Sequence, residues 1–336
     1  MKNFGIGIVG TGTVGCGVIE IIQKHAASYP ASVHIAKVCS LEQSQAEKYG
    51  FGAQFTSDFD ALINSPEVDI VVEVIGGTGA AYDIVKSALE AGKHVVTANK
   101  ALIASKGKEL LQLAFDKGLC LYFEAAVGGA IPLIDPLHRL LKSNQISKIE
   151  GILNGTTNFI LDLMLNKNLS YEEALSEAQA NGFAEADPSA DVDGYDSAAK
   201  IAILASISFG KFVSIDDVDT QGIRDIELAD LVDAKEKGCV VKLLAVAEDR
   251  KDGISVQVKP SVLKMTHELA NVNGVYNAAC FTGDFFGKAL MYGEGAGAGP
   301  AASSVVADIV NVAKAASLDN PTFDNIVFGE KATIVK

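Results

Sequence analysis

The segment from Asn181 to Lys200 carries the side chains best suited to chemistry. Its sequence, NGFAEADPSADVDGYDSAAK, holds five carboxylates and reaches its first positive charge only at Lys200. The next residues, IAILASIS, are almost wholly apolar, and a helix that is apolar on all sides is normally buried. Asp196 and Lys200 are four residues apart and therefore share one helix face. This pair, entering an apolar interior together, indicates an active site; the alternative is a solvated acidic loop that caps a helix.

A glycine-rich turn near the N-terminus predicts a dinucleotide site. The sequence GTGTVG matches G-x-G-x-x-G, follows a predicted strand (residues 4–9) and opens a predicted helix (residues 13–23). Gly10 allows the tight turn, Gly12 lets the backbone approach a pyrophosphate, and Gly15 allows close packing of helix on strand. The helix N-terminus offers N–H groups to phosphate; the alternative is a turn without a ligand. The candidate cofactor contacts of this loop are Gly10, Thr11, Gly12, Thr13, Val14 and Gly15.

Two further candidates lie where predicted parallel strands end, because such sheets bind ligands outside the carboxyl ends of their strands. Lys100 follows the strand at residues 94–97, and we expect it to point into the crevice of the nicotinamide; the alternative is a surface lysine at a helix start. The strand at residues 33–39 ends in Ser40, which could donate to a ribose hydroxyl or to a 2′-phosphate. The acid typical of NAD sites is absent there, and so is the arginine of NADP sites. This tilts the expectation slightly toward NADP, or toward use of both.

Hydrophobic patterning predicts two domains. In the first third, strands alternate with helices, which indicates a Rossmann-like, doubly wound parallel sheet in an α/β domain. The later pattern indicates a second, α+β domain with a mixed or antiparallel sheet. We expect domain boundaries at residues 1–130, with 300–336 packing back on this domain, and at 131–299. The other expected elements are strands at 69–75, 119–127, 149–153, 240–247, 254–258, 277–281 and 288–292, and helices at 81–92, 105–117, 157–165 and 301–316.

Composition excludes several classes of partner. The net charge is −14 with no Lys/Arg-rich run, which argues against nucleic acid or an anionic membrane and favours a small-molecule substrate. The five cysteines are scattered without a CxxC pair, as in a reducing compartment. The N-terminus has no signal-peptide pattern, and no apolar run approaches the length of a membrane span. We therefore expect a cytoplasmic protein.

Several motifs together resemble homoserine dehydrogenase, in the order in which that family has them. They are GIVGTGTVGCGV, VTANKALI, EAAVGGAIPLI, GILNGTTNFI, GFAEADPSADVDGYDSAAK and GEGAGAGPAASSVVADI, and the match covers nearly all of residues 4–316. The acidic stretch is the specific part, whereas many oxidoreductases share the glycine-rich turn. The resemblance implies reduction of L-aspartate 4-semialdehyde to L-homoserine with NAD(P)H, on the route to threonine, isoleucine and methionine. It also implies a homodimer, with residues 131–299 as the substrate-binding, catalytic and dimerisation domain.

The resemblance assigns roles to individual residues. Lys200 matches the catalytic lysine, Asp196 its partner, and Lys100 a second lysine near substrate and nicotinamide. Glu185 matches a residue that binds the amino group of homoserine. The other implied substrate contacts are Asp191, Gly155 and Thr156, and further cofactor contacts are Gly182 and Gly297. Glu124 and the backbone of Val127, Gly129 and Ile131 match a site for a monovalent cation such as sodium; a plain glycine-rich turn is the commoner meaning of such a segment.

The sequence differs from the family pattern at several points, and two other functions are possible alternatives. The family often has an Arg-Asp pair where this chain has Ser40-Leu41, which leaves the choice of cofactor open. From the end of the chain at Lys336 we expect neither a regulatory domain for threonine feedback nor a fused aspartokinase. Aspartate-semialdehyde dehydrogenase is the alternative enzyme, but it needs an accessible, activated cysteine, and none of the five is persuasive. A non-catalytic NAD(P)-binding sensor is the alternative of a different class.

Overall fold

The computed structural model describes residues 2–318 and 323–335, which form two compact units. The first unit contains the chain up to Ala130 and the segment Gly297–Phe328. The second contains Ile131–Ala296 and the residues from Gly329 onward. The sequence placed this last segment with the first domain. In the structure this segment belongs to the second unit, to which it is joined by two isolated parallel β-bridges, Phe212 with Lys331 and Ile254 with Ile334.

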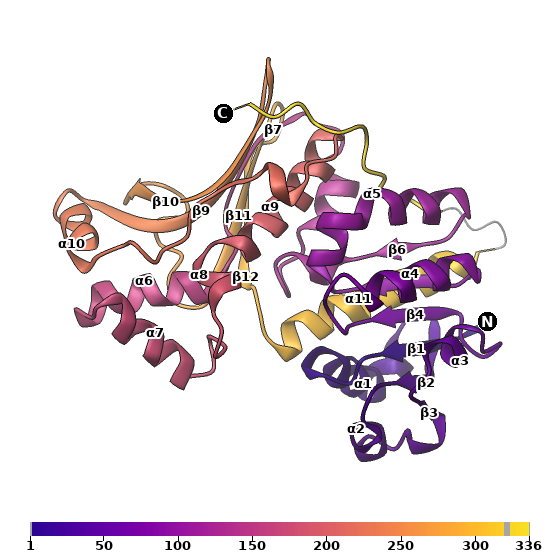
Figure 1. Ribbon diagram of the computed structural model, residues 1–336. Helices are drawn as coiled ribbons and strands as arrows, with labels where there is room; N and C mark the ends of the chain where they lie inside the picture. Colours follow the sequence, from indigo (N-terminus) through magenta and orange to yellow (C-terminus); the bar gives the residue numbers. More distant parts are fainter. Residues whose placement is uncertain (1, 319–322, 336) are drawn as a thin grey trace. The chain divides into compact units, whose positions relative to one another are not determined.

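The first unit is built on a six-stranded parallel sheet in the order β3-β2-β1-β4-β5-β6 (Figure 1). This is the Rossmann strand order, in which the order reverses between β1 and β4. The strands are β1 (Asn3–Val9), β2 (Ser32–Cys39), β3 (Phe55–Thr56), β4 (Ile70–Glu73), β5 (His94–Thr97) and β6 (Leu121–Tyr122). The helices are α1 (Thr13–His25), α2 (Gln43–Lys48), α3 (Phe59–Ile63), α4 (Ala80–Glu90), α5 (Lys100–Asp116) and α11 (Ala298–Ala316).

Helices cover both faces of this sheet, so its strands read as continuous apolar runs. One face of β1, with Phe4, Ile6 and Ile8, packs on the buried residues of α1 and α11. These two helices come from opposite ends of the sequence and lie side by side (Figure 1). Helices α4 and α5 pack against β4, β5 and β6. The predicted doubly wound parallel sheet is therefore confirmed.

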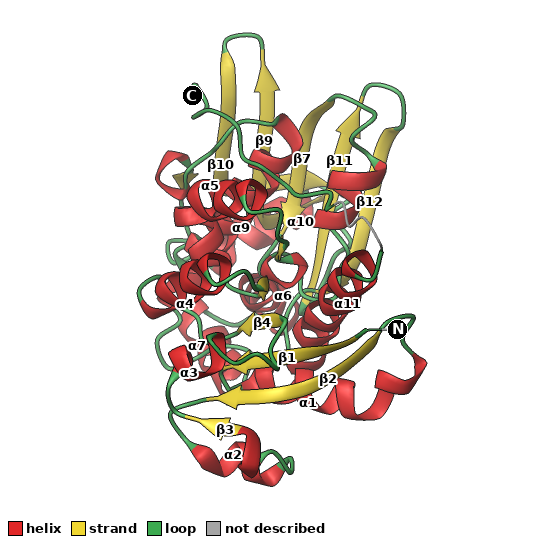
Figure 2. Cartoon of the chain, turned by 90° about the vertical axis from the view of Figure 1, so that its right-hand side faces the viewer, coloured by secondary structure: helices red, strands yellow, loops and turns green. Residues whose placement is uncertain are grey.

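The second unit has a six-stranded mixed sheet in the order β12-β11-β7-β9-β10-β8. All neighbours are antiparallel except β10 and β8, and Figure 2 shows the long strands running beside one another. The strands are β7 (Ile146–Ile152), β8 (Asp219–Thr220), β9 (Cys239–Arg250), β10 (Gly253–Lys264), β11 (Tyr276–Gly283) and β12 (Gly287–Glu294). The helices are α6 (Gly155–Lys167), α7 (Tyr171–Ala180), α8 (Ser189–Val192), α9 (Tyr195–Phe209) and α10 (Leu228–Glu236).

Several expected elements have different bounds in the structure, and two of the differences have a clear cause. The strand expected at residues 119–127 is only Leu121–Tyr122, because a 3-10 turn at Glu124–Ala126 ends the pairing. The helix expected from residue 105 begins at Lys100, because the side chain of Asn99 caps it by accepting from Leu102 N. Among the described residues, no helix combines the length and the apolar character needed to cross a bilayer.

A buried lysine fixes helix α6 in the second unit. Lys242, on β9, is 2% exposed, and its Nζ donates to Asn158 Oδ1 (3.0 Å), Val272 O (2.6 Å) and Asn273 Oδ1 (3.1 Å). Asn158, on α6, donates in turn to the carbonyl of Val272. Burial lowers the pKa of Lys242 to about 8, although the Asp162 carboxylate opposes that shift. This polar cluster ties the second turn of α6 to β9 and to the loop before β11.

The lowered pKa of Lys242 predicts a stability that increases with pH. Below about pH 8 the lysine is protonated in both the folded and the unfolded chain. Between about pH 8 and its unfolded value of about 10.5, the unfolded chain holds more protons, so the free energy of unfolding rises. We expect the parent to gain up to about 3 kcal/mol over Lys242→Met between pH 7 and pH 10, measured by urea denaturation. An unfolding-energy difference between the two proteins that stays constant with pH would contradict the assignment.

Candidate active site

The junction between β7 and α6 forms the base of the candidate site. Asn154 is the N-cap of α6, and its Oδ1 accepts from Thr157 N (2.8 Å) and Thr157 Oγ1 (3.0 Å). The next residue, Gly155, has no room for a side chain, because a Cβ there would lie 2.5 Å from the carbonyl oxygen of Val275. The motif GILNGTTN is therefore a strand end, a cap and a helix start held in close contact with the loop before β11.

The ammonium of Lys200 lies at this junction. Helix α9 is almost wholly apolar, and both Lys200 and Asp196 are only 8% exposed. Lys200 Nζ donates to Asp196 Oδ2 and to the carbonyl oxygen of Leu153, each at 2.7 Å. The pair predicted from the i,i+4 spacing is therefore present. Two of the three N–H groups of the ammonium are engaged, and the third can donate to a substrate oxygen.

Asn154 also connects Lys200 to a second carboxylate. Its Nδ2 donates to Asp196 Oδ2 (2.9 Å) and to Asp191 Oδ1 (2.6 Å). The structure thus brings three predicted residues, Lys200, Asp196 and Asp191, into one hydrogen-bonded group. Asn154 is not among the residues predicted from the sequence. Its position directly before the helical stretch marks it as an N-cap, but the bonds to the carboxylates arise only from the tertiary fold.

The short helix α8 holds Asp191 in place. The segment after β8 packs tightly on it: Ile223 N donates to the carbonyl of Val192 (2.8 Å). A Cβ on Gly222 would lie 2.0 Å from the same carbonyl oxygen, so only glycine allows this approach. Helix α8 has no room to shift toward this segment.

An arginine fixes α8 from its other side. The Arg224 guanidinium binds both carboxylate oxygens of Asp193, the residue that follows α8, and its NH2 group donates to Ser189 Oγ (3.1 Å). Planar bidentate pairing adds geometric precision as well as energy. Because Ser189 and Asp193 bracket α8, this pair sets the orientation from which Asp191 reaches Asn154.

The loop that carries Glu185 is anchored to the start of α6. Thr156 Oγ1 donates to the carbonyl of Phe183 (2.7 Å), and Gln179 Nε2 donates to the carbonyl of Glu185 itself (3.0 Å). Gly182, at φ +74°, makes the turn that ends α7. The Glu185 side chain is exposed. The predicted substrate residues Thr156 and Glu185 therefore belong to two segments that are joined by a direct hydrogen bond.

In the first unit, the glycine-rich turn has the geometry of a phosphate site. Gly10 has φ +109°, and a Cβ on Gly15 would lie 2.0 Å from the Gly10 carbonyl oxygen. Gly12 is the N-cap of α1, provides no side-chain cap, and has open space where its Cβ would be. The first amides of an α-helix lack partners within the helix, so this open end can accept a phosphate group. Gly297, at φ +123°, is likewise the N-cap of α11 without a side-chain cap.

Ser40 lies beside this turn, because Thr11 Oγ1 donates to Ser40 Oγ (2.7 Å). The next residue, Leu41, is 97% exposed, and Glu42 is the N-cap of α2. The end of β2 therefore presents hydroxyls, without a carboxylate at the tip of the strand.

Lys100 is the first residue of α5, and a hydrogen-bonded network below it sets its position. The fully buried carboxylate of Glu73, at the end of β4, accepts from the Thr97 hydroxyl and from two backbone N–H groups of the following loop. Thr97 Oγ1 accepts from Asn99 N, and Asn99 Nδ2 donates to the carbonyl of Gly77 (2.7 Å). A lysine at a helix N-terminus opposes the helix dipole, so the dipole does not stabilise its charge.

The predicted cation ligands lie on the chain segment from Glu124 to Ile131. Glu124 is 7% exposed, and its backbone N–H donates to Asp308 Oδ2 (2.8 Å). Gly129, at φ +57°, directs its carbonyl oxygen to Ser304 Oγ (2.6 Å). Val127 is extended, and Ile131 opens the second unit. The described residues contain no cluster of three or more His, Cys, Asp or Glu side chains, so backbone oxygens would have to supply most of the ligands.

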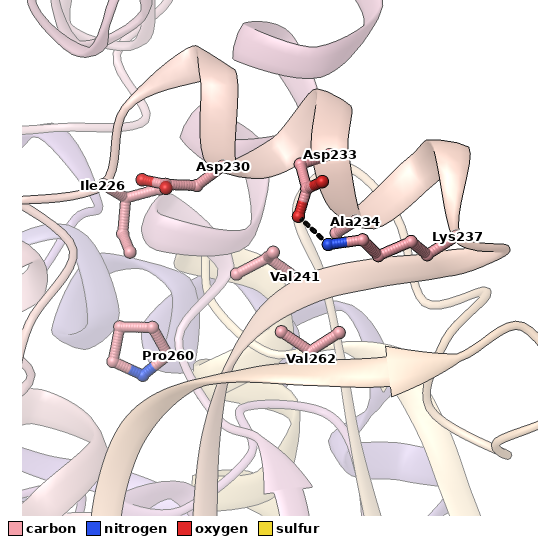
Figure 3. Close-up of a pocket in the computed structure, with 8 residues that line it drawn as sticks. All are labelled: Ile226, Asp230, Asp233, Ala234, Lys237, Val241, Pro260 and Val262. Carbon is pink, nitrogen blue, oxygen red and sulfur yellow. Dashed lines mark hydrogen bonds and ion pairs between the residues drawn. The ribbon is translucent and has the colours of Figure 1, made fainter.

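A separate pocket of about 320 Å³ lies between α10 and the β9–β10 hairpin (Figure 3). Its floor is apolar, with Val241, Pro260 and Val262, and the ion pair of Asp233 and Lys237 lies at its edge. None of the predicted site residues lines this pocket.

Comparison with known proteins identifies the chain. A family model described as "Homoserine dehydrogenase" matches residues 132–310, and one described as "Homoserine dehydrogenase, NAD binding domain" matches residues 10–124. Homoserine dehydrogenase of Synechocystis sp. is 42% identical over 96% of this chain and 76% of its own length. That of Corynebacterium glutamicum is 44% identical over 92% of this chain and 72% of its own length.

Solved structures agree. A homoserine dehydrogenase from Thiobacillus denitrificans has a TM-score of 0.92 and 37% identity, covering 98% of this chain and 80% of that one. A hyperthermophilic archaeal homoserine dehydrogenase in complex with NADPH has a TM-score of 0.81 and 28% identity, covering 95% of this chain and all of that one.

A Rossmann-type unit with an open phosphate-binding turn, joined to a unit that buries an ion-paired lysine, defines an NAD(P)-linked oxidoreductase. The chain belongs to the homoserine dehydrogenase family. The predicted activity, NAD(P)-dependent interconversion of L-homoserine and L-aspartate 4-semialdehyde in amino-acid biosynthesis, is confirmed at this level. The cysteines argue against the alternative enzyme, aspartate-semialdehyde dehydrogenase. Burial raises the pKa of Cys39 to about 11 and also raises the pKa values of Cys16 and Cys280. These shifts disfavour the nucleophilic thiolate that the alternative enzyme needs.

The pair of Arg224 and Asp193 predicts a small effect on substrate affinity. Arg224→Met removes the contacts that orient α8, so we expect KM for homoserine to rise about 3- to 10-fold, with KM for the dinucleotide unchanged. The effect is modest because the pair is partly exposed. Arg250→Met is the matched control, since Arg250 has the same 44% side-chain exposure and pairs with Glu248 on the same domain. Equal KM values in the two variants would contradict the role of Arg224.

Proposed function

We propose that this chain reduces L-aspartate 4-semialdehyde, and oxidises L-homoserine, with Lys200 as the proton-transfer residue. The observation that carries the proposal is the buried ammonium with two N–H groups engaged by Asp196 Oδ2 and Leu153 O and a third available. In the reduction, the aldehyde carbon gains a hydride and the oxygen gains a proton. NAD(P)H supplies the hydride when it is bound. Lys200 donates to the carbonyl oxygen, polarises it, and protonates the developing alkoxide.

The remaining site residues bind and orient the substrate in this proposal. Glu185 pairs with the α-ammonium of the amino acid, since a zwitterion needs an anion at that position. Asp191, Gly155 and Thr156 line the substrate side of the same junction. Lys100 lies near substrate and nicotinamide, and it is the rival candidate for proton transfer. Glu185, Gly155 and Thr156 are supported by the hydrogen bond that joins their two segments.

The proton-transfer role is tested by alanine substitution. Lys200→Ala should lower kcat by roughly 10²- to 10⁴-fold, the range for one general acid–base group. Dinucleotide binding should survive, because the phosphate turn is made of backbone in the first unit. Lys200→Arg should also be poor, because guanidinium keeps its proton and needs a different geometry. Homoserine oxidation is to be compared across pH for Lys200→Ala and Lys100→Ala. A near-normal kcat and pH profile in the first would refute the assignment, and a matching loss confined to the second would transfer the role to Lys100.

We also propose that the protein accepts both dinucleotides, with a slight preference for NADP. The support is the end of β2, where the Ser40 and Thr11 hydroxyls stand in place of the carboxylate that binds the NAD ribose. The candidate contacts are the glycine turn from Gly10 to Gly15, Ser40, Lys100, Gly182 and Gly297. Steady-state oxidation of homoserine with NAD and NADP side by side is the test. A kcat/KM for NAD equal to or above that for NADP would contradict the preference.

A sodium-type cation, bound by Glu124 and by the carbonyl oxygens of Val127, Gly129 and Ile131, is a further part of the proposal. A hard cation suits carboxylate and carbonyl oxygens. Glu124 is buried, and Gly128 and Gly129, a few residues later in the chain, have positive φ. Such a cation would hold this turn in shape and would take no part in the chemical step. Thermal unfolding in sodium and in tetramethylammonium chloride at equal ionic strength tests it; identical midpoints would contradict it.

We propose a cytoplasmic homodimer that acts on a small molecule and binds neither nucleic acid nor membrane. The edge strand β12 exposes Leu290 (47%) and Tyr292 (54%), and Tyr292 stacks on Tyr276 at 5.1 Å. Such an apolar edge is suited to pairing with a second copy. All five cysteines are free thiols, as expected in a reducing compartment. Sedimentation equilibrium tests the dimer.

A further inference from the structure

Asn154 makes more hydrogen bonds than a helix cap requires. Its side chain is buried, at 5% exposure, and both of its polar atoms are engaged. The Oδ1 atom accepts from the backbone and the hydroxyl of Thr157, while the Nδ2 atom donates to Asp191 and Asp196. All the usual hydrogen-bonding capacity of an amide, two donors and two acceptor positions, is therefore used.

The helix itself fixes which way this amide points. Oxygen and nitrogen of an asparagine side chain are distinguished by their partners. Because the amide N–H of Thr157 can only donate, the atom that faces it must be the oxygen, and the nitrogen must face the carboxylates. The start of α6 thus forces two N–H groups toward the two acids.

One of these N–H groups donates to the same carboxylate oxygen of Asp196 that accepts from Lys200. Asp196 Oδ2 accepts from Asn154 Nδ2 (2.9 Å) and from Lys200 Nζ (2.7 Å). A carboxylate held by one partner can rotate, whereas the same oxygen held by two donors from different elements has a fixed position. The adjacent carbonyl of Leu153 takes a second N–H of the ammonium. Consecutive residues at the end of β7 therefore constrain Lys200, one directly and one through Asp196.

The same amide stabilises two neighbouring negative charges. Asp191 and Asp196 both accept from one nitrogen atom, so their carboxylates lie on either side of it. Like charges this close repel each other, and a donor shared between them offsets the repulsion. An amide gives each carboxylate one charge-assisted hydrogen bond and adds no charge of its own.

We infer that Asn154 is a positioning residue for proton transfer: it locks Asp196 and Asp191 against the start of α6, so that the third N–H of Lys200 is directed at the substrate oxygen. This inference rests on the proposed role of Lys200. It assigns to Asn154 a role in the reaction that is separate from capping α6. Neither serine nor aspartate can replace it in that role, although both are good N-caps.

The experiment uses variants that keep the cap and remove the amide. Asn154→Ser keeps a capping oxygen and loses the double donor, and Asn154→Asp keeps the cap and places a third carboxylate beside the other two. We expect kcat for homoserine oxidation to fall about 10- to 100-fold in Asn154→Ser, which corresponds to one lost charge-assisted hydrogen bond, and further in Asn154→Asp. KM for the dinucleotide should stay within twofold of the parent. The solvent deuterium isotope effect on kcat should increase, because proton transfer becomes slower relative to other steps.

A matched control separates capping from positioning. Ser170→Ala removes the N-cap of α7 in the same unit, where Ser170 Oγ accepts from Glu173 N and the Glu173 carboxylate accepts from Ser170 N. It should lower the melting temperature while kcat and the isotope effect stay at parental values. If Asn154→Ser also lowers only the melting temperature, Asn154 is a cap and the inference is wrong.

Two outcomes separate this inference from the assignment on which it rests. A loss of kcat in Lys200→Ala together with a parental kcat and isotope effect in Asn154→Ser overturns the inference alone. A near-normal kcat in Lys200→Ala overturns the proposed function, and the inference with it.

Discussion

The burial of one ammonium group constrains most of the second unit. Lys200 lies on an apolar helix and is 8% exposed, and an isolated charge in such surroundings would cost several kcal/mol. The cost is met by one carboxylate and one carbonyl oxygen, and the carboxylate is itself held by an amide. Each partner belongs to a different element: Asp196 to α9, Leu153 to the end of β7, and Asn154 to the cap of α6. The position of the lysine therefore depends on the relative placement of all three.

That dependence explains why the surrounding contacts are so specific. Glycine is needed at residues 155 and 222, because a side chain at either position would collide with a backbone carbonyl. Arg224 fixes α8 through its ion pair with Asp193, and Lys242 fixes the start of α6 through its hydrogen bond to Asn158. The first unit contains a similar polar network. Buried Glu73 binds the loop after β4 and Thr97 at the end of β5, and Asn99, directly before Lys100, binds the loop after β4. In both units, polar networks orient the residues proposed to carry the chemistry, while apolar packing supplies stability.

Local features of the sequence are sufficient to predict much of the fold and part of the candidate site. The i,i+4 spacing of Asp196 and Lys200 and the strand–turn–helix context of the glycine motif both depend on neighbours in sequence, and both appear in the structure. The alternating pattern also located most long strands. The features that could not be predicted are set by tertiary contacts. They are the amide of Asn154 between two acids, the contacts of Arg224 on either side of α8, and the early end of β6, after which the amide of Glu124 donates to Asp308 of α11. Residue types at these positions are ordinary, and only the fold brings them to their partners.

The interior position of β7 in its sheet determines how heat inactivates the enzyme. This strand pairs on one side with β11 and on the other with β9, so it is interior to the sheet, and the residues that hold Lys200 lie directly at its end. Interior strands open only with the whole cooperative unit, whereas edges and loops open in small local fluctuations. Backbone amides along β7 should therefore be among the slowest to exchange with solvent. Heat would inactivate this centre only as the second unit unfolds as a whole, and fraying at the sheet edges would leave it intact.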